Sequence, residues 1–328
     1  MVSFNSDSSF DMIDSSTQDS PTMTNLFIAS EDTRHQVRVA VTQAEPKWLD
    51  LQGSVDKTCA LIIEAAKGGA ELLAFPECWV TGYPAWIWAR PVDTHLTSRY
   101  IKNCMRADGP EMARIQQCAA DNNITAIIDS DGKLLAVRRK IKATHMERTI
   151  FGDASGDALT SVVDTKVGRV GALSCWEHIQ PLLKYYLYSH REQIHVAAWP
   201  PLHPYKDEKE LWSMSREGAR ALSQTYAIES QAFVLHATSV ISEQGISLMN
   251  TGGGAVMSTP GGGSSAIFGP DGRILTEDLP QCDEGILYAT LDLDEILRCK
   301  SFVDVCGHYS RPDMLWLGVD REVKKHVQ

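Results

Sequence analysis

A short apolar strand that ends in a cysteine most strongly constrains the fold of this chain. Residues 170–174 are an apolar run interrupted by glycine, and Cys175 follows it directly. A helix-like segment then begins near Pro181. A short apolar run with glycine and proline at its flanks is typical of a buried strand. The sequence therefore predicts a strand–turn–helix unit of an α/β protein, with one thiol at the strand end.

Cys175 alone does not identify a function. Helix N-terminal amides favour a thiolate over a thiol, so a cysteine at such a turn suits a nucleophile. However, free cysteine is among the most buried residue types, and in an apolar strand it is usually a small core residue. The functional interpretation therefore depends on groups elsewhere in the chain.

A carboxylate follows an earlier strand in the same way. Residues 37–43 alternate as a strand, residues 50–67 have the pattern of an amphipathic helix, and residues 72–75 form an apolar run that Pro76 ends. Glu77 comes next and is followed by the aromatic segment 78–88. A carboxyl group among aromatic side chains has a raised pKa, as a general base requires. The alternative is an ordinary solvated carboxylate.

A basic segment marks a third strand end. Residues 108–122 look helical, and residues 124–129 and 133–140 predict a β-hairpin with Asp131-Gly132 at its turn. The second strand ends at Lys140, and His145 and Glu147 follow shortly after. A basic cluster is usually a solvated face, but this one is joined by an imidazole and a carboxylate. Further predicted elements are helices at 182–191 and 211–228, strands at 194–200, 233–237 and 285–291, a flexible loop at 239–265, and a hairpin at 265–275.

Composition excludes several classes of function. The net charge is −11, and the first 33 residues hold six acidic side chains and no Lys or Arg, so there is no basic footprint for nucleic acid. No apolar run approaches the ~20 residues of a membrane helix. Eight scattered cysteines predict neither a disulfide framework nor a zinc site, and the chain lacks a secretory signal. We therefore expect a cytoplasmic protein with residues 1–34 as a disordered leader, 35–315 as the folded domain and 316–328 as a short tail.

Five motifs in order resemble the nitrilase branch of the carbon-nitrogen hydrolase superfamily, close to the arylacetonitrilase type of bacteria and fungi. The resemblance covers about residues 37–313, and Trp176 and Glu177 after the cysteine are more similar to true nitrilases than to the amidase branches. The motifs are 75–77 with 82–84, 138–148, 172–177, 195–200 and 307–313.

The resemblance implies a four-layer α-β-β-α sandwich and assigns roles to the strand-end residues. Cys175 would be the nucleophile, Glu77 the general base, Lys140 the cation facing the tetrahedral intermediate, and Glu147 a second carboxylate near the thiol. A nitrile would become a carboxylic acid and ammonia through a thioimidate and a thioester, with no metal or organic cofactor. The implied partners are a small-molecule nitrile and further copies of the chain, in dimers and possible spirals. Candidate pocket walls for an aryl or arylacetonitrile are Tyr83, Trp86, Trp176 and Trp199.

The chain departs from the family between the helix ending near Asn122 and the turn at Asp131. Family members place two strands there, whereas this chain has room for one, residues 124–129. A six-residue strand spans ~20 Å, so losing one of an antiparallel pair must rearrange the connection. The strand leading to Lys140 is next to this defect, so we hypothesise either an incomplete gene model or a damaged nitrilase. The alternative functions are an amidase, carbamoylase or cyanide hydratase, or a catalytically impaired subunit that still assembles.

Overall fold

The computed structural model describes residues 36–125, 130–207, 209–324 and 327, so the predicted leader lies outside the described residues. The strands are β1 Gln36–Ala44, β2 Leu72–Ala74, β3 Val162–Thr165, β4 Gly168–Ser174, β5 Ile194–Trp199, β6 Phe233–Ser239, β7 Ala266–Phe268 and β8 Gly285–Asp292. The α-helices are α1 Leu51–Lys67, α2 Thr94–Lys102, α3 Pro110–Asp121, α4 Pro181–Ser189, α5 Arg216–Ser230, α6 Glu243–Met249 and α7 Asp294–Phe302. Short 3-10 turns are η1 Ala85–Trp88, η2 His145–Thr149, η3 Gly156–Leu159, η4 Cys175–Ile179 and η5 Trp212–Met214.

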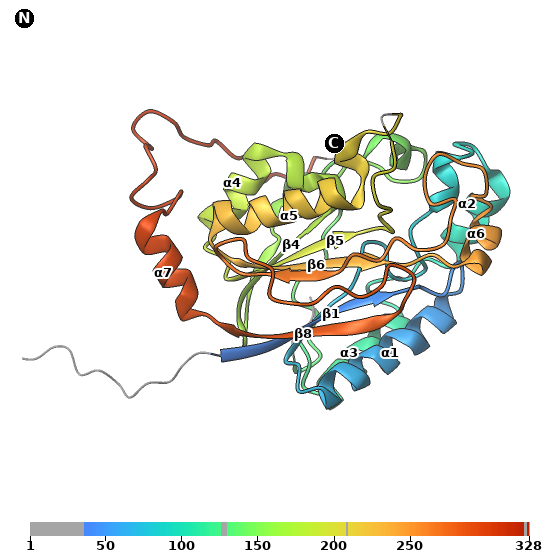
Figure 1. Cartoon of the computed structure of the whole chain (residues 1–328), viewed down its shortest axis with the longest axis horizontal. Coiled ribbons are helices and arrows are strands. Elements are labelled where there is room, and N and C mark those ends of the chain that lie inside the picture. Colours follow the sequence, from blue (N-terminus) through green and yellow to red (C-terminus); the bar gives the residue numbers. More distant parts are fainter. Residues whose placement is uncertain (1–35, 126–129, 208, 325–326, 328) are drawn as a thin grey trace, which may run out of the picture. The chain divides into compact units, whose positions relative to one another are not determined.

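The strands form a curled sheet in the order β2-β1-β6-β5-β4-β3, with β8 also paired to β1 and β7 to β6. The neighbours β4, β5 and β6 are parallel, and so are β1 and β2. Parallel strands need crossover connections, which α4 and α5 supply between β4, β5 and β6. Figure 1 shows α4 and α5 on one side of these strands and α1 and α3 on the far side of β1 and β8.

Three apolar clusters separate the layers. Val39 and Val41 of β1 pack with Leu235 of β6 in the space between the two halves of the sheet. The intervening Ala40 points the other way and packs with the helices α1 and α3. On the opposite side, α4 and α5 pack against β4–β6 through a cluster that includes Leu187. Because strand side chains alternate between faces, this arrangement gives the expected α-β-β-α sandwich.

The predicted hairpin after α3 is wrong in its second half. Residues 135–140 have no regular structure, and between α3 and β3 the described residues contain no strand. Thr125 makes a single parallel bridge to Leu72, and residues 126–129 of the predicted first strand lie outside the described residues. A strand needs a partner for its backbone N–H and C=O groups, and the described residues offer none along 135–140.

The prediction of a flexible loop at 239–265 is also wrong. Helix α6 lies within it, begun by Ser242, whose hydroxyl accepts a hydrogen bond from the Gly245 N–H. Ser265 is buried, and its hydroxyl hydrogen-bonds the backbone of β1 at Thr42. Glycine, serine and threonine here form a buried hydrogen-bond network rather than a solvated loop. Among the described residues, no helix is both long and apolar enough to cross a bilayer.

Candidate active site

Cys175 occupies the sharp turn between β4 and η4. Its φ is +51°, a left-handed conformation that non-glycine residues rarely adopt outside functional sites and tight turns. The turn is fixed by a capping box in which Ser174 and Glu177 each bond the other's backbone. The side chain is buried but lines a cavity. The structure therefore places the thiol where the sequence predicts it, at the end of a strand.

Four predicted site residues from three separate segments meet at this turn. The Lys140 Nζ lies 3.0 Å from Glu77 Oε1 and 2.8 Å from Glu147 Oε2. One carboxylate oxygen from each glutamate and the Cys175 Sγ all lie within 4.8 Å of one another. The thiol, the two carboxylates and the cation thus form one buried cluster.

Burial sets the protonation of this cluster. The pKa of the Glu77 carboxyl is raised to about 7 by burial, with Lys140 lowering it and Glu147 raising it. Burial and the charge of Glu77 raise the pKa of the Cys175 thiol well above its ordinary value, while Lys140 and the Trp176 N–H act in the opposite direction. Burial lowers the pKa of Lys140, but the neighbouring acids outweigh it and the net shift is upward. Near neutral pH the cluster therefore holds a charged lysine, a protonated thiol and a half-ionised Glu77.

Glu177 holds Lys140 in place although the predicted strand is not formed. Its fully buried carboxylate accepts hydrogen bonds from Arg138 Nη1 and Nη2 at 2.7 and 2.6 Å, and from the Ile141 N–H at 2.8 Å. It also accepts the Ser174 N–H at 3.0 Å. One carboxylate thus ties the residues on both sides of Lys140 to the residue before Cys175. Lys140 thus contacts both glutamates although the strand before it is not formed, and the clamp by Glu177 was not predicted.

Glu147 is oriented by its own neighbours. Its Oε2 accepts the Thr144 N–H at 2.8 Å, and its Oε1 accepts a 3.0 Å hydrogen bond from the Tyr83 hydroxyl. The Trp88 indole N–H in turn donates to the Tyr83 oxygen at 3.1 Å. Tyr83 was predicted as a pocket wall, and the structure adds a hydrogen bond that fixes the second carboxylate.

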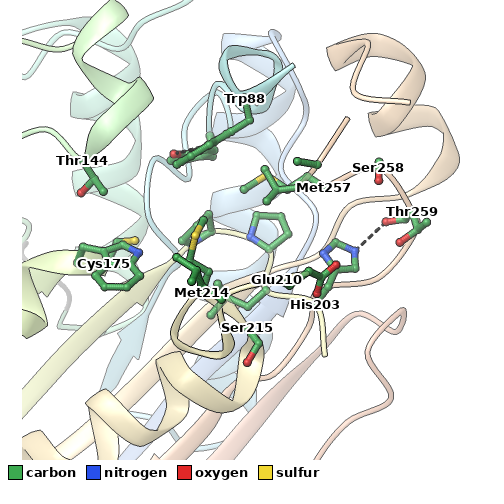
Figure 2. A pocket seen from close by; sticks show the side chains of 18 of the residues that line it. Trp88, Thr144, Cys175, His203, Glu210, Met214, Ser215, Met257, Ser258 and Thr259 are labelled. Carbon is green, nitrogen blue, oxygen red and sulfur yellow. Dashed lines mark hydrogen bonds between the residues drawn. The ribbon is translucent and has the colours of Figure 1, made fainter. Parts of the chain in front are cut away.

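A cavity of about 290 Å³ opens over Cys175. Figure 2 shows Cys175 and Thr144 at one end and His203 and Thr259 at the other. Of the predicted pocket walls, Tyr83 and Trp176 line the cavity, but Trp86 and Trp199 do not. The cavity is lined by Tyr83, Trp88, Thr144, Glu147, Cys175, Trp176, Pro200, Pro201, Leu202, His203, Lys206, Lys209, Glu210, Leu211, Met214, Ser215, Ala255, Val256, Met257, Ser258 and Thr259.

Trp86 and Trp199 are core residues instead. Both are almost fully buried, at 0% and 1% exposure. Trp86 packs edge-on against Tyr100, and the Trp199 indole donates to the Ser223 hydroxyl at 3.1 Å. Aromatic side chains near a strand end serve packing as readily as a pocket, and the sequence does not distinguish the two.

The thiol and two carboxylates are also residue types that bind metals. Within the described part of the chain, Glu77, Glu147 and Cys175 form a group with metal-ligand spacing. However, Lys140 Nζ hydrogen-bonds both carboxylates and supplies the positive charge that an ion would bring. The donor set therefore fits an acid–base cluster better than a metal site.

Comparison with known families agrees with this geometry. The profile of the carbon-nitrogen hydrolase family matches residues 38–129 and 123–301. The chain belongs to the carbon-nitrogen hydrolase family. The solved carbon-nitrogen hydrolase from Helicobacter pylori G27 shares its fold, with a TM-score of 0.65 at 17% identity, covering 82% of this chain and 93% of that one. An amidase from Nesterenkonia sp. has a TM-score of 0.56 at 20% identity, covering 80% of this chain and 92% of that one.

Curated family members from fungi are much more similar in sequence. An arylacetonitrilase of Aspergillus kawachii is 64% identical, covering 89% of this chain and 94% of the relative. An arylacetonitrilase of Aspergillus niger has the same identity and coverage. One from Hypocrea virens is 57% identical, with 89% and 94% covered. Within its family, this carbon-nitrogen hydrolase is thus close to the arylacetonitrilases.

These relatives contain residues that this carbon-nitrogen hydrolase lacks. The alignment with the A. kawachii protein spans 310 positions, but 89% of 328 residues is only about 292, which leaves roughly 18 positions without a counterpart here. The two segments matched to the family overlap at residues 123–129. These residues therefore match two places in the family profile. We infer that the shortfall lies beside them, where the sequence has room for one strand instead of two.

Proposed function

We propose that this chain is a nitrilase that converts an arylacetonitrile and two waters to an arylacetic acid and ammonia. The observation that carries the proposal is the buried cluster of Cys175, Glu77, Glu147 and Lys140 beneath a cavity. The 64% identity to proteins named arylacetonitrilases supports the substrate class. A thiol, a base with a pKa of about 7 and a cation are the groups that covalent attack on a nitrile carbon requires.

The first step forms a thioimidate. The Glu77 carboxylate takes the Cys175 proton as the sulfur attacks the nitrile carbon, and one electron pair of the triple bond moves to nitrogen. Lys140 stabilises the negative charge that develops there. The nitrogen then takes the proton back from Glu77. A base whose pKa lies near the working pH can perform both transfers.

Two hydrolytic steps complete the reaction. Water loses a proton to Glu77 and adds to the thioimidate carbon, the nitrogen is protonated, and the carbon–nitrogen bond breaks to release ammonia. A second water attacks the resulting thioester through the same base. The carbon–sulfur bond then breaks, which frees the carboxylic acid and restores the thiol. Glu147 hydrogen-bonds Lys140 together with Glu77 and so keeps the ammonium group in place.

The cavity suits an aromatic group next to the nitrile. Trp88, Trp176, Met214 and Met257 contribute aromatic or thioether surface around the thiol. Such side chains bind a ring by edge, face and sulfur contacts. Cys175 and Glu147 line the cavity whereas Glu77 and Lys140 do not, so a bound nitrile meets the thiol before it meets the base.

Ammonia release from a panel of nitriles tests the proposal. We expect release from phenylacetonitrile by the full chain and none by Cys175→Ala, with arylacetic acid as the co-product. Amide as the main product would indicate a hydratase-type reaction on the same scaffold. Equal ammonia release by the two proteins would overturn the nitrilase assignment. A folded, oligomeric protein with an inert Cys175 would instead support the impaired assembly subunit.

Assembly and location are further parts of the proposal. We infer that copies of the chain form homo-oligomers built from dimers, which light scattering of the purified protein would measure. We also propose that the enzyme works in the cytoplasm, because its eight cysteines follow no disulfide pattern along the sequence.

A further inference from the structure

A chain of buried polar groups lies beneath the nucleophile, outside the substrate cavity. His178 Nδ1 is 2.7 Å from the Cys175 carbonyl oxygen, and His178 Nε2 is 3.0 Å from His195 Nε2. His195 Nδ1 is 2.9 Å from Glu192 Oε2, and the Tyr226 hydroxyl donates to the other oxygen of Glu192. All four side chains are at most 2% exposed, and none lines the cavity. Burying this many titratable groups is costly, so the arrangement requires an explanation.

Hydrogen-bond chemistry determines which atom donates and which accepts along this series of buried polar groups. A carbonyl oxygen only accepts, so His178 Nδ1 carries a proton and donates to Cys175. Burial, and next the charge of His195, lower the pKa of His178 well below its ordinary value, so His178 is neutral and its Nε2 accepts. His195 Nε2 is therefore the donor to His178, while His195 Nδ1 is held by its contact with Glu192. The direction therefore runs from His195 through His178 to the Cys175 carbonyl.

The Cys175 carbonyl belongs to the same peptide group as the Trp176 N–H. That N–H hydrogen-bonds the Cys175 thiol and lowers its pKa. Because a peptide group is planar, fixing its carbonyl oxygen also fixes the direction of its N–H. Cys175 needs this support, since its left-handed φ of +51° is costly for a non-glycine residue.

We propose that His178, held by His195 and Glu192, is a positioning residue that aims the Trp176 N–H at the reacting sulfur. Aromatic packing keeps both imidazoles in place: Trp199 stacks on His178 at 5.3 Å and Tyr226 on His195 at 3.8 Å between ring centroids. Trp199 thus acts behind the nucleophile rather than on the pocket wall. The proposal deepens the nitrilase assignment and rests on it for its kinetic readout.

Two substitutions of His178 separate its bond to Cys175 from its other contacts. His178→Asn places an amide N–H near the position of Nδ1, whereas His178→Leu has no donor; both lose the contact with His195. A second pair of variants tests the contact between His195 and His178 in the same way. His195→Gln keeps a donor toward His178, whereas His195→Phe has none. Thermal unfolding of each variant reports the folded fraction.

The readout is thiolate formation at Cys175, followed as the pH dependence of iodoacetamide alkylation by peptide mass spectrometry. The other titratable groups that face this thiol are Glu77, Glu147 and Lys140, and those that face His178 are His195, His236 and Lys184. All of these stay unchanged in the His178 pair. The exposed thiols Cys104 and Cys282 serve as internal references.

We expect His178→Leu to shift the alkylation midpoint upward by about one pH unit, because the Trp176 N–H loses its alignment and its hydrogen bond to the charged thiolate weakens. We also expect it to lower kcat for phenylacetonitrile by about 10- to 100-fold with little change in KM. His178→Asn should stay within about threefold of the parent, because a donor to the carbonyl remains. If the parent releases no ammonia, the nitrilase assignment fails but the alkylation profiles still test the positioning role.

Equal changes of kcat and of the alkylation midpoint in His178→Asn and His178→Leu would overturn the proposal. So would a His178→Leu variant whose kcat and midpoint, corrected for its folded fraction, equal those of the parent. If His178→Leu does not fold, the His178→Asn and His195→Gln variants decide it. Both retain the donor that matters, so a shift in either alkylation midpoint as large as a full pH unit contradicts the positioning role.

Discussion

The Glu77 carboxyl determines how the reaction rate falls on the acidic side of the pH–rate profile. Its pKa is raised to about 7 by burial, against the opposing effect of Lys140, and only the carboxylate form can take the Cys175 proton. We therefore predict that kcat/KM is maximal above this value and falls about tenfold per pH unit as the pH decreases below it. Initial rates of ammonia release between pH 5 and pH 9 measure this, at conditions where the protein stays folded. A kcat/KM that stays nearly constant down to pH 5 would contradict a buried base, because a carboxyl group with the ordinary pKa of about 4.3 is still mostly ionised there.

Glu177 is the residue whose loss should separate Lys140 from Cys175. Glu177→Gln leaves the Arg138 guanidinium buried without its counter-charge, at 9% side-chain exposure. Breaking such a pair costs about 3–5 kcal/mol of unfolding free energy, and it also loosens the segment that carries Lys140. We predict that urea unfolding of Glu177→Gln measures this decrease in the free energy of unfolding. We also predict a lower kcat at temperatures where the variant is folded.

The exposed pair of Arg169 and Asp164 provides the matched control for Glu177. Its side chains are 47% and 80% exposed, and the Nε–Oδ1 distance is 2.8 Å. An exposed ion pair is screened by solvent and contributes little, so Asp164→Asn should unfold at the same urea concentration as the parent. Equal effects of the two substitutions would mean that the Glu177 clamp contributes no more than a surface contact.

At the level of elements, the short connection after α3 leaves a cavity of about 480 Å³ between the sheet and the segment 134–138. Ala198 of β5 faces this cavity, whereas its neighbour Ala197 packs in the full core under α4 and α5. We predict that Ala198→Leu maintains or increases the free energy of unfolding, because its added methyl groups fill space. Ala197→Leu should lower it by about 1–3 kcal/mol through overpacking. Denaturant unfolding of both variants measures the difference, and equal destabilisation would mean that the cavity is closed in solution.

The sequence predicted those elements whose side-chain pattern reports burial directly. β1, α1, β2, α3, β4, α4, β5, β6 and β8 lie within two residues of the predicted bounds, whereas α5 begins five residues later than predicted because η5 precedes it. It could not predict residues 135–140, whose apolar alternation resembles a strand but which pair with no described neighbour. It also missed α7, in which Ile296 is the buried residue. Local pattern specifies a strand only where a partner strand exists.

Site prediction failed for the same reason wherever a role depends on a distant contact. Glu77, Lys140, Glu147 and Cys175 were identified by their motifs, and the structure brings them together. The clamp by Glu177 joins side chains 39 residues apart in sequence and could not be read from either segment alone. Trp199, predicted as a pocket wall, differs from a pocket residue only in the direction in which its strand face points.

For the folded unit as a whole, the C-terminal tail supports the active site from a distance. The Glu322 carbonyl accepts the Gly156 N–H at 3.3 Å, and the Arg321 guanidinium lies 5.5 Å from the centre of the Tyr186 ring. Gly156 begins η3, and the carbonyl of Ala158 in that turn accepts a 2.9 Å hydrogen bond from Arg138 Nε. The tail therefore contacts η3, and η3 hydrogen-bonds Arg138. Arg138 is in turn the ion-pair partner of Glu177.

Because the tail contacts Gly156, we predict that removing the tail and substituting Gly156 have the same effect, and that the two effects are not additive. Removing residues 316–328 takes away the tail, and Gly156→Ala should displace it, because a Cβ at Gly156 would come within 2.7 Å of the Arg321 Cα. Each change should lower the unfolding temperature by about 2–4 °C and reduce kcat, with KM little changed. Gly156→Ala in the truncated chain should have no further effect, since the atom it would strike is gone. Differential scanning calorimetry and ammonia release on the four proteins form a double-mutant cycle, and additive losses would show that the tail and η3 act independently.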